Sequence, residues 1–380
     1  MRFLRMKLEQ NIYTYTTKPY KMITYKLHHV QGIFFELLDD GGKNKEYEVS
    51  FVDRKDNTII FETKLKPKGW AKAERRYFSD VVIYVRYEGR TLKQINVIDE
   101  IKGKRVFINF ESKSIGDTLA WIPYCKEFKD TYDCDVMVSS FHNYLFEKMY
   151  PELTFVARGS VVHNLMAMFD LGWFYDKYKE PEHPATIPLQ KTASNILNVP
   201  FVEILPSLSF EVKERPINEK YIAISTISTA RCKLWDYWQE LIDILVSKGY
   251  KVFEVSKDAT TFKNIITPED KSFENVMNIL HHADLFIGLS SGISWLNWAL
   301  GKRSVMISNF TDKDHEFKIN CTRIINESVC HGCWNNPIFK FNKGDWNWCP
   351  EHEDTPRQFE CHKTISALEV MGKIEGLLTS

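Results

Sequence analysis

The chain has 380 residues, more than one hydrophobic core usually serves, so we expect two or three domains. Apolar residues make up 44% of the sequence, and 50 basic residues balance 50 acidic ones. The composition is that of a globular protein without the basic surplus that nucleic-acid binding requires. The sequence has no run of about 18 apolar residues, the length that a membrane-spanning helix needs. Its charged N-terminus lacks the apolar core of a signal peptide. We therefore expect a cytoplasmic protein.

Residues 1–100 are expected to form a β-rich N-terminal domain. Short segments rich in β-branched and aromatic residues, such as IYTYTT, IFFELL, TIIFETKL and VVIYVRYEG, alternate with Gly, Asp and Asn. Strands of this length and spacing predict a small antiparallel sheet or sandwich.

From residue 101 the pattern changes to alternating strands and helices. KRVFINF reads as a buried strand and TLAWIPYCKEFKDTY as the helix after it, which predicts a parallel sheet. A stretch rich in proline and charge then connects to a second alternating set. The predicted fold class is therefore α/β, with two facing Rossmann-like lobes at residues 101–215 and 216–325. A ligand cleft is expected between them, at the C-terminal ends of the strands.

The first candidate site is Asp117, in the turn of INFESKSIGDTLAWIPY. A strand, a Ser-Ile-Gly-Asp turn and a helix would place this carboxylate at the mouth of the first lobe. There it could remove a proton from a hydroxyl group. The alternative is that Asp117 is a helix N-cap, a common role for Asp after a turn.

The second candidate site is the loop in AISTISTARCKLW, where hydroxyls and two cations follow a strand. Hydroxyls, backbone amides and cations at a helix N-terminus suit a diphosphate. The alternative is a solvated loop with ordinary helix caps. The residues that could contact the phosphates are Ser228, Thr229, Arg231 and Lys233.

The third candidate site is the loop that opens GLSSGISWLNWALG. It lies between a strand and a helix and again offers amides to a phosphate. Trp295 and Trp298 could stack on a base or sugar, although their helical spacing makes at least one a core residue. The loop residues are Ser290, Ser291 and Gly292.

Near the C-terminus, residues 326–365 contain four cysteines spaced C-x2-C-x15-C-x11-C, and we call this stretch the cysteine segment. Four thiolates at such spacing predict a tetrahedral metal site without an open position, hence a structural one, either zinc or iron. The metal is expected to affect folding and assembly more than the chemical step. A C-terminal helix is expected at 366–380. The predicted ligands are Cys330, Cys333, Cys349 and Cys361. The neighbouring histidines are expected outside the ligand set, and these are His331, His352 and His362. The other cysteines read as small apolar residues, namely Cys125, Cys134, Cys232 and Cys321.

Several of these stretches resemble a known family. SKSIGDTLAWIP resembles the S-x-G-D turn of bacterial lipopolysaccharide heptosyltransferases, which have the two-lobed GT-B fold. Where those enzymes carry Asp-Thr-Gly and a His, this chain has Ser290, Ser291 and Ser294. GDTLAW, CKLW and the cysteine segment are instead similar to the bacterial autotransporter heptosyltransferases, which glycosylate serines of autotransporter adhesins in the cytosol.

The resemblance implies an inverting transfer of heptose from ADP-heptose to a passenger-domain serine. Asp117 would be the general base, and Lys233 would bind the diphosphate without a divalent metal. The cysteines would hold one structural iron, and the chain would assemble into a ring-like homo-oligomer such as a dodecamer. The N-terminal domain would contact the acceptor or other subunits. The expected substrate contacts are Thr118, Ser228, Thr229, Arg231, Lys233, Trp235, Ser290, Ser291 and Gly292.

Two other functions remain open from the sequence. One is a transferase that acts on a lipid-linked or oligosaccharide acceptor, for which KPKGW and KAERRYFSD are the candidate membrane-facing patch. The other is a metal-stabilised binding module that has lost catalysis. The loss of Asp and His near residue 290 favours the module, and the retention of Asp117 and Lys233 opposes it.

Overall fold

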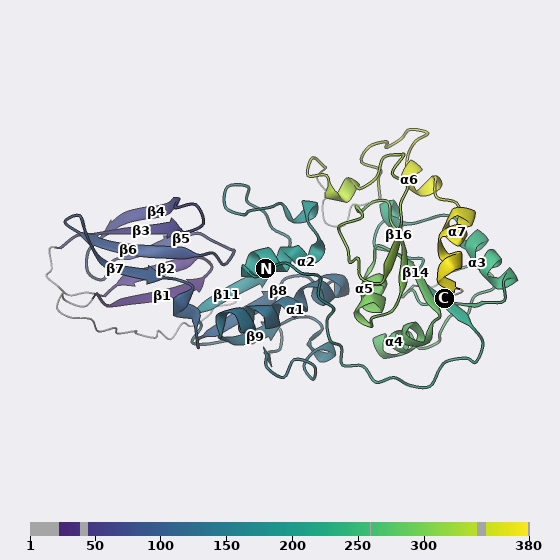
Figure 1. Cartoon of the computed structure of the whole chain (residues 1–380), viewed down its shortest axis with the longest axis horizontal. Coiled ribbons are helices and arrows are strands. Elements are labelled where there is room, and N and C mark those ends of the chain that lie inside the picture. The colour runs from purple at the N-terminus through teal and green to yellow at the C-terminus, as the bar shows by residue number, and fades with distance from the viewer. Residues whose placement is uncertain (1–22, 39–44, 259, 340–346, 379–380) are drawn as a thin grey trace.

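The computed structural model describes residues 23–38, 45–258, 260–339 and 347–378. Within these ranges the chain forms three sheets, of seven, five and four strands. Figure 1 shows the N-terminal sheet, the first lobe and the second lobe in a row. The segment IYTYTT, predicted as a strand, lies outside the described residues.

The N-terminal sheet is antiparallel, with the order β4-β3-β6-β7. Its central strands bury alternate apolar residues, such as Phe51 and Ile83, which face each other across the β3–β6 pair. Alternation of this kind is the reason these segments pair as half-buried strands. The predicted antiparallel N-terminal sheet is confirmed. The strands are β3 (Tyr47–Asp53), β4 (Ile59–Leu65), β6 (Val81–Tyr87) and β7 (Arg90–Asn96).

The sheet of the first lobe has the order β10-β9-β8-β11-β1-β2-β5. Its β1 strand comes from the N-terminal region and pairs in parallel with β11, with His29 opposite Ala167. The β-rich N-terminal region is therefore divided between two sheets. The strands are β1 (Tyr25–Val30), β2 (Ile33–Leu37), β5 (Trp70–Ala73), β8 (Arg105–Phe110), β9 (Asp135–Ser139), β10 (Thr154–Phe155) and β11 (Ala167–Leu171).

The main helix of the first lobe, α1 (Ile115–Tyr132), follows β8 and is buried along most of its first three turns. This first part is buried because α2 and β9 of the same lobe and α5 of the second lobe all contact the helix. The other helical elements here are α2 (Leu189–Leu197), η1 (Asp99–Ile101), η2 (Asn143–Leu145) and η3 (Pro184–Thr186).

The second lobe contains a parallel sheet with the order β13-β12-β14-β15-β16. Helices α3 and α7 contact each other at one side of this lobe, and α4 contacts α5 (Figure 1). The strands are β12 (Tyr221–Ile224), β13 (Lys251–Glu254), β14 (Leu285–Leu289), β15 (Ser304–Ile307) and β16 (Cys321–Ile324). The helices are α3 (Trp238–Ser247), α4 (Phe273–His282), α5 (Gly292–Ala299), α6 (Glu360–Lys363) and α7 (Ala367–Leu378), with the 3-10 turns η4 (Arg231–Lys233) and η5 (Cys333–Asn335).

The two lobes meet where α1 packs against α5. A Cβ atom added at Gly292 would lie 2.4 Å from Cγ2 of Ile115, and one at Gly116 would lie 3.0 Å from the Trp295 ring. Glycine at both positions lets the first turns of the helices approach closely. The predicted α/β architecture with two parallel-sheet regions is confirmed. No helix within the described ranges has the length and apolarity to cross a membrane.

Candidate active site and cysteine segment

Asp117 lies in the first turn of α1 and is 8% exposed. The N-cap of the helix is Ser114, whose hydroxyl accepts a hydrogen bond from the Asp117 backbone N–H at 3.5 Å. The alternative in which Asp117 caps the helix is therefore wrong. Its carboxylate instead accepts a hydrogen bond at Oδ2 from the indole Nε1–H of Trp173, at 3.0 Å.

The surroundings of Asp117 raise its pKa above the ordinary value for aspartate. Burial is the largest cause, because it disfavours the charged carboxylate. Hydrogen bonds from Ser112 and Trp173 and the charge of Lys233 act in the opposite direction. A buried carboxylate with a raised pKa and a cation nearby is a candidate general base.

Lys233 ends the η4 turn of the second lobe, and its charge acts on the Asp117 carboxylate of the first lobe. Burial lowers the pKa of its ammonium group, while the charges of Glu316, the Cys232 thiolate form and Asp117 raise it. The lysine charge therefore interacts with one carboxylate from each lobe. A cation in this position can also stabilise an anionic group that enters the cleft.

Glu316 is the second-lobe carboxylate beside Lys233 and is 4% exposed. Burial alone would raise its pKa, but Arg323, His315 and the Ser290 hydroxyl outweigh burial and hold the pKa at about 2. Arg323 Nη2 donates to Glu316 Oε2 at 2.7 Å, and the Ser290 hydroxyl donates to Oε1. Glu316 therefore stays charged at neutral pH and binds the third candidate loop through the Ser290 hydroxyl.

The two predicted phosphate loops touch each other. The Ser228 hydroxyl donates to the Ser290 carbonyl at 3.0 Å. Ser291 precedes α5, and its buried hydroxyl has no hydrogen-bond partner among the described residues. Arg231 makes an ion pair with Asp236 at 3.1 Å. These hydroxyls and the first amides of α5 provide donors of the kind that bind a phosphate.

The cysteine segment brings its four thiols into one neighbourhood. Cys333, Cys349 and Cys361 are buried, and Cys330 is half-buried. Burial raises the pKa of Cys330 and of Cys333 to about 12 and raises the pKa of Cys361 as well. The next cause is Glu360 for Cys330 and the neighbouring thiols for Cys333 and Cys361. The four sulfur atoms do not form a closed tetrahedral set in this conformation.

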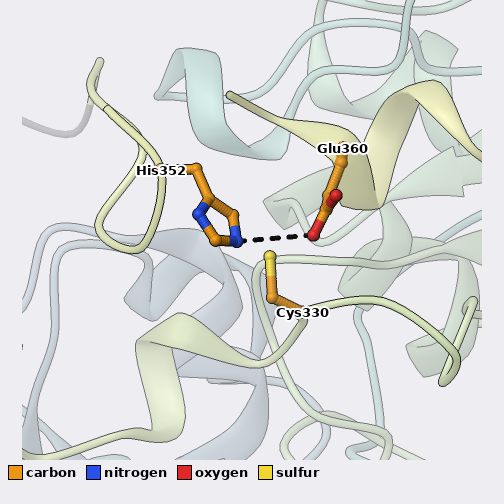
Figure 2. A group of neighbouring side chains, drawn as sticks. All are labelled: Cys330, His352 and Glu360. Carbon is orange, nitrogen blue, oxygen red and sulfur yellow. Dashed lines mark ion pairs between the residues drawn. The ribbon is translucent and has the colours of Figure 1, made fainter. Parts of the chain in front are cut away.

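The tightest group of potential ligands in the described residues is Cys330, His352 and Glu360, whose ligand atoms lie within 4.8 Å of one another. Figure 2 shows the three side chains pointing toward each other, with His352 Nε2 at 3.4 Å from Glu360 Oε1. Arg357 also pairs with Glu360, and this pair is the main cause that lowers the glutamate's pKa to about 2. His352 is thus paired with Glu360, and both lie beside the Cys330 thiol.

The cysteine segment packs on the predicted diphosphate loop. Cys333, Cys349 and Phe359 form one buried cluster with Ala230 and Cys232 of that loop. The ring of Phe359 also lies 5.0 Å from the Arg231 guanidinium. In addition, His362 Nδ1 lies against the Leu234 carbonyl. The segment therefore shapes the loop that carries Lys233.

Comparison with known proteins agrees with this geometry. Residues 193–325 match the family described as glycosyltransferase family 9 (heptosyltransferase). The autotransporter heptosyltransferase Aah of Escherichia coli is 31% identical over 350 residues, which cover 87% of this chain and 89% of Aah. The chain belongs to the autotransporter heptosyltransferase family. The predicted family and the predicted enzyme class, a glycosyltransferase, are thereby confirmed.

The fold of this heptosyltransferase is shared by TibC of enterotoxigenic E. coli. The TibC crystal structure is 28% identical, with a TM-score of 0.80 over 96% of this chain and 97% of that one. TibC is described as an iron-containing dodecamer, and a second structure holds ADP-D-beta-D-heptose. Another relative is BimC of Burkholderia thailandensis, which is 28% identical over 90% of this chain and 83% of its own and is named as inactive.

Two of the predicted substrate contacts of the heptosyltransferase are buried and hydrogen-bonded to backbone carbonyls. Thr118 is fully buried, and its hydroxyl donates to the Ser114 carbonyl within α1. Trp235 is buried in the second-lobe core, where its indole N–H donates to the Ile365 carbonyl at 2.8 Å. These contacts give Thr118 and Trp235 a part in packing, and their role as substrate contacts stays a prediction. Thr229 is exposed on the loop beside Ser228.

Three residues of the candidate site were not predicted from the sequence, because they belong to no recognisable motif. Trp173 follows β11, and its position just after a parallel strand was a usable signal because strand ends converge at one edge of the sheet. Glu316 and His315 lie in an irregular stretch between β15 and β16. Nothing local marks them, since their partners come from other segments.

Proposed function

We propose that this protein is an active heptosyltransferase that moves heptose from ADP-heptose to serine hydroxyls of an autotransporter adhesin, with inversion at the anomeric carbon. The observation that carries the proposal is the pair Asp117 and Lys233, one from each lobe, whose charges interact, with Asp117 in the first turn of the helix α1 that packs against α5. The ligand of the TibC complex supports ADP-heptose as the donor.

Asp117 supplies the general base. Its carboxylate accepts the proton of the serine hydroxyl while the serine oxygen attacks the anomeric carbon and the bond from that carbon to the diphosphate oxygen breaks. The raised pKa makes the carboxylate a better proton acceptor than an ordinary aspartate. The proton then leaves to solvent, which restores the base.

Lys233, Arg231 and the first amides of α5 stabilise the departing ADP. Charge builds up on the diphosphate as the glycosidic bond breaks, so fixed positive groups lower the barrier. Ser228, Thr229, Ser290, Ser291 and Gly292 are proposed to line the same site. These groups need no divalent metal to hold the diphosphate.

The four cysteines are proposed to hold one structural iron, as the description of TibC suggests. An all-thiol donor set in one neighbourhood fits a tetrahedral thiolate site, and binding would displace the thiol protons. The iron would cross-link the segment. A cytoplasmic location, in which thiols stay reduced, belongs to the same proposal. Assembly into a ring, as in dodecameric TibC, is also proposed, with residues 1–100 contacting subunits or acceptor.

The test is co-expression with an adhesin passenger fragment in a host that makes ADP-heptose, followed by intact-mass analysis. We expect additions of heptose mass that vanish with Asp117→Asn. The control is Asp133→Asn, the same change at the other end of α1, where the side chain is exposed. Additions of another sugar mass would change the donor. No additions would contradict the adhesin acceptor.

A second candidate, a non-catalytic module, is favoured by the description of the relative BimC as inactive. Purified protein incubated with ADP-heptose separates the two. Release of ADP that depends on Lys233 excludes the module, while donor binding without release or transfer supports it.

A further inference from the structure

Trp173 connects the base to the opposite lobe. Its indole N–H donates to Asp117 Oδ2 at 3.0 Å. The ring meets Trp334, with the centroids 5.3 Å apart and the planes at 79°, and it also meets His315 at 6.2 Å. Trp173 belongs to the first lobe, whereas Trp334 directly follows the predicted metal ligand Cys333.

Trp334 is itself held in a fixed place. Its backbone N–H donates to the Phe310 carbonyl at 2.9 Å. The adjacent Asn335 donates through Nδ2 to the Ala185 carbonyl of the first lobe at 2.6 Å and accepts from the Asp312 N–H at 2.7 Å. The η5 turn therefore bridges the two lobes beside the catalytic pair.

A general base must keep its carboxylate in the orientation that meets the substrate proton. An indole offers one N–H on a rigid ring, so the direction of the donor depends on how the ring is packed. Trp173 meets the Trp121 ring of α1 at 6.2 Å and the Trp334 ring at 5.3 Å. Removing the Trp334 ring would take away the nearer of these two contacts.

We propose that Trp173 is a positioning residue that orients Asp117, and that Trp334 of the cysteine segment holds Trp173 in place. The proposal rests on the proposed role of Asp117 as the base. It gives the cysteine segment a part in the chemical step, in addition to the folding role expected from its spacing.

Several other polar and charged groups surround Asp117 and the residues that contact it. Ser112 donates to Asp117, and Lys233 is the cation that faces it from the second lobe. Glu316 lies beside Lys233, and His315 lies against Trp173. Trp334 also meets the His315 ring, with the centroids 6.1 Å apart.

The test is the pH profile of heptose transfer to a purified passenger fragment at saturating donor, with Trp173→Phe compared with the parent protein. The variant keeps a ring but loses the N–H that stabilises the carboxylate. We expect kcat to fall about tenfold at neutral pH. The acid limb should move to higher pH, while the KM for donor and the affinity for ADP by calorimetry stay unchanged.

Trp334→Leu should move the acid limb in the same direction, and Trp334→Phe should move it less because an aromatic ring remains. The matched control is Trp238→Phe, which removes a buried indole from the core of the second lobe. This control should lower the melting temperature without moving the acid limb.

An unmoved acid limb in Trp173→Phe would overturn the positioning role. If Trp173→Phe fails to fold, an unmoved limb in Trp334→Leu would overturn the link to the cysteine segment. Asp117→Asn in the same series separates the two proposals. Full activity of Asp117→Asn would refute the role of Asp117 as the base. Loss of activity in Asp117→Asn, together with an unmoved acid limb in the two tryptophan variants, would refute only the positioning role.

Discussion

The two buried carboxylates of the site, Asp117 in the first lobe and Glu316 in the second, have opposite pKa shifts. Asp117 receives hydrogen bonds from two uncharged side chains and faces Lys233, and burial raises its pKa. Glu316 has a direct ion pair with Arg323 at 2.7 Å, and its pKa falls to about 2. One carboxylate is suited to exchange a proton and the other to remain charged, so environment decides their roles.

The largest expected effect is that of Asp117→Asn. The amide keeps the shape of the side chain but accepts no proton, so kcat should fall on the order of 10²–10⁴-fold. Transfer rates measured by mass spectrometry check this, with Asp133→Asn retaining the parent rate. A loss below tenfold would remove Asp117 from the role of base.

Lys233→Gln should follow, with a loss on the order of 10²–10³-fold in kcat because the leaving diphosphate loses a fixed cation. Release of ADP from ADP-heptose measures this directly. The control is Lys248→Gln, whose side chain forms an exposed ion pair with Glu375 on the far side of the lobe. An equal loss in both variants would point to damaged folding.

Glu316→Gln should reduce stability rather than remove the chemistry. It leaves Arg323 buried without its anion, which commonly costs on the order of 3 kcal/mol. Thermal unfolding at pH 7 measures the cost. Asp284→Asn, which weakens a half-buried pair with Arg215, should cost less. A catalytic defect in Glu316→Gln without lost stability would contradict the contrast between the carboxylates.

The pH dependence separates the same two groups. Because the pKa of Asp117 is raised, transfer should fall as the pH drops at values above those of an ordinary aspartate. Because the pKa of Glu316 is lowered from 4.5 to about 2, its contribution to folding is present above pH 4.5 and is lost as the pH falls toward 2. As the pH falls, transfer activity should therefore be lost before the contribution of Glu316 to stability is lost. If both were lost at the same pH, the different roles given to Asp117 and Glu316 would be contradicted.

The smallest expected effect concerns His352, which contacts Glu360 at 3.4 Å at the edge of the cysteine cluster. His352→Gln should leave transfer unchanged and alter only the content of the proposed iron after purification, because its ion-pair partner Glu360 belongs to the cysteine segment and not to the proposed catalytic pair. Metal analysis together with transfer rates measures both. A changed transfer rate at full iron content would extend the active site to His352.

Much of the site followed from local patterns. A turn between a strand and a helix was enough to mark Asp117, the loop before Lys233 and the loop at Ser290. The cysteine spacing likewise marked a segment whose thiols do gather. The same reasoning could not distinguish Asp117 from a helix cap, because that choice depended on Ser114 and Trp173. Nor could it show that the Trp235 indole N–H donates to the Ile365 carbonyl in the core of the second lobe.

The sequence by itself determined the alternation of strands and helices, the loops at the strand ends and the chemistry of the cysteine segment, because periodicity and spacing are local properties. Only the tertiary structure decided that β1 joins the sheet of the first lobe, that α1 meets α5 at two glycines and that Trp334 reaches Trp173. The tertiary structure also decided the opposite pKa shifts of Asp117 and Glu316. A pKa depends on burial and on neighbours from distant parts of the chain, and folding alone brings those together.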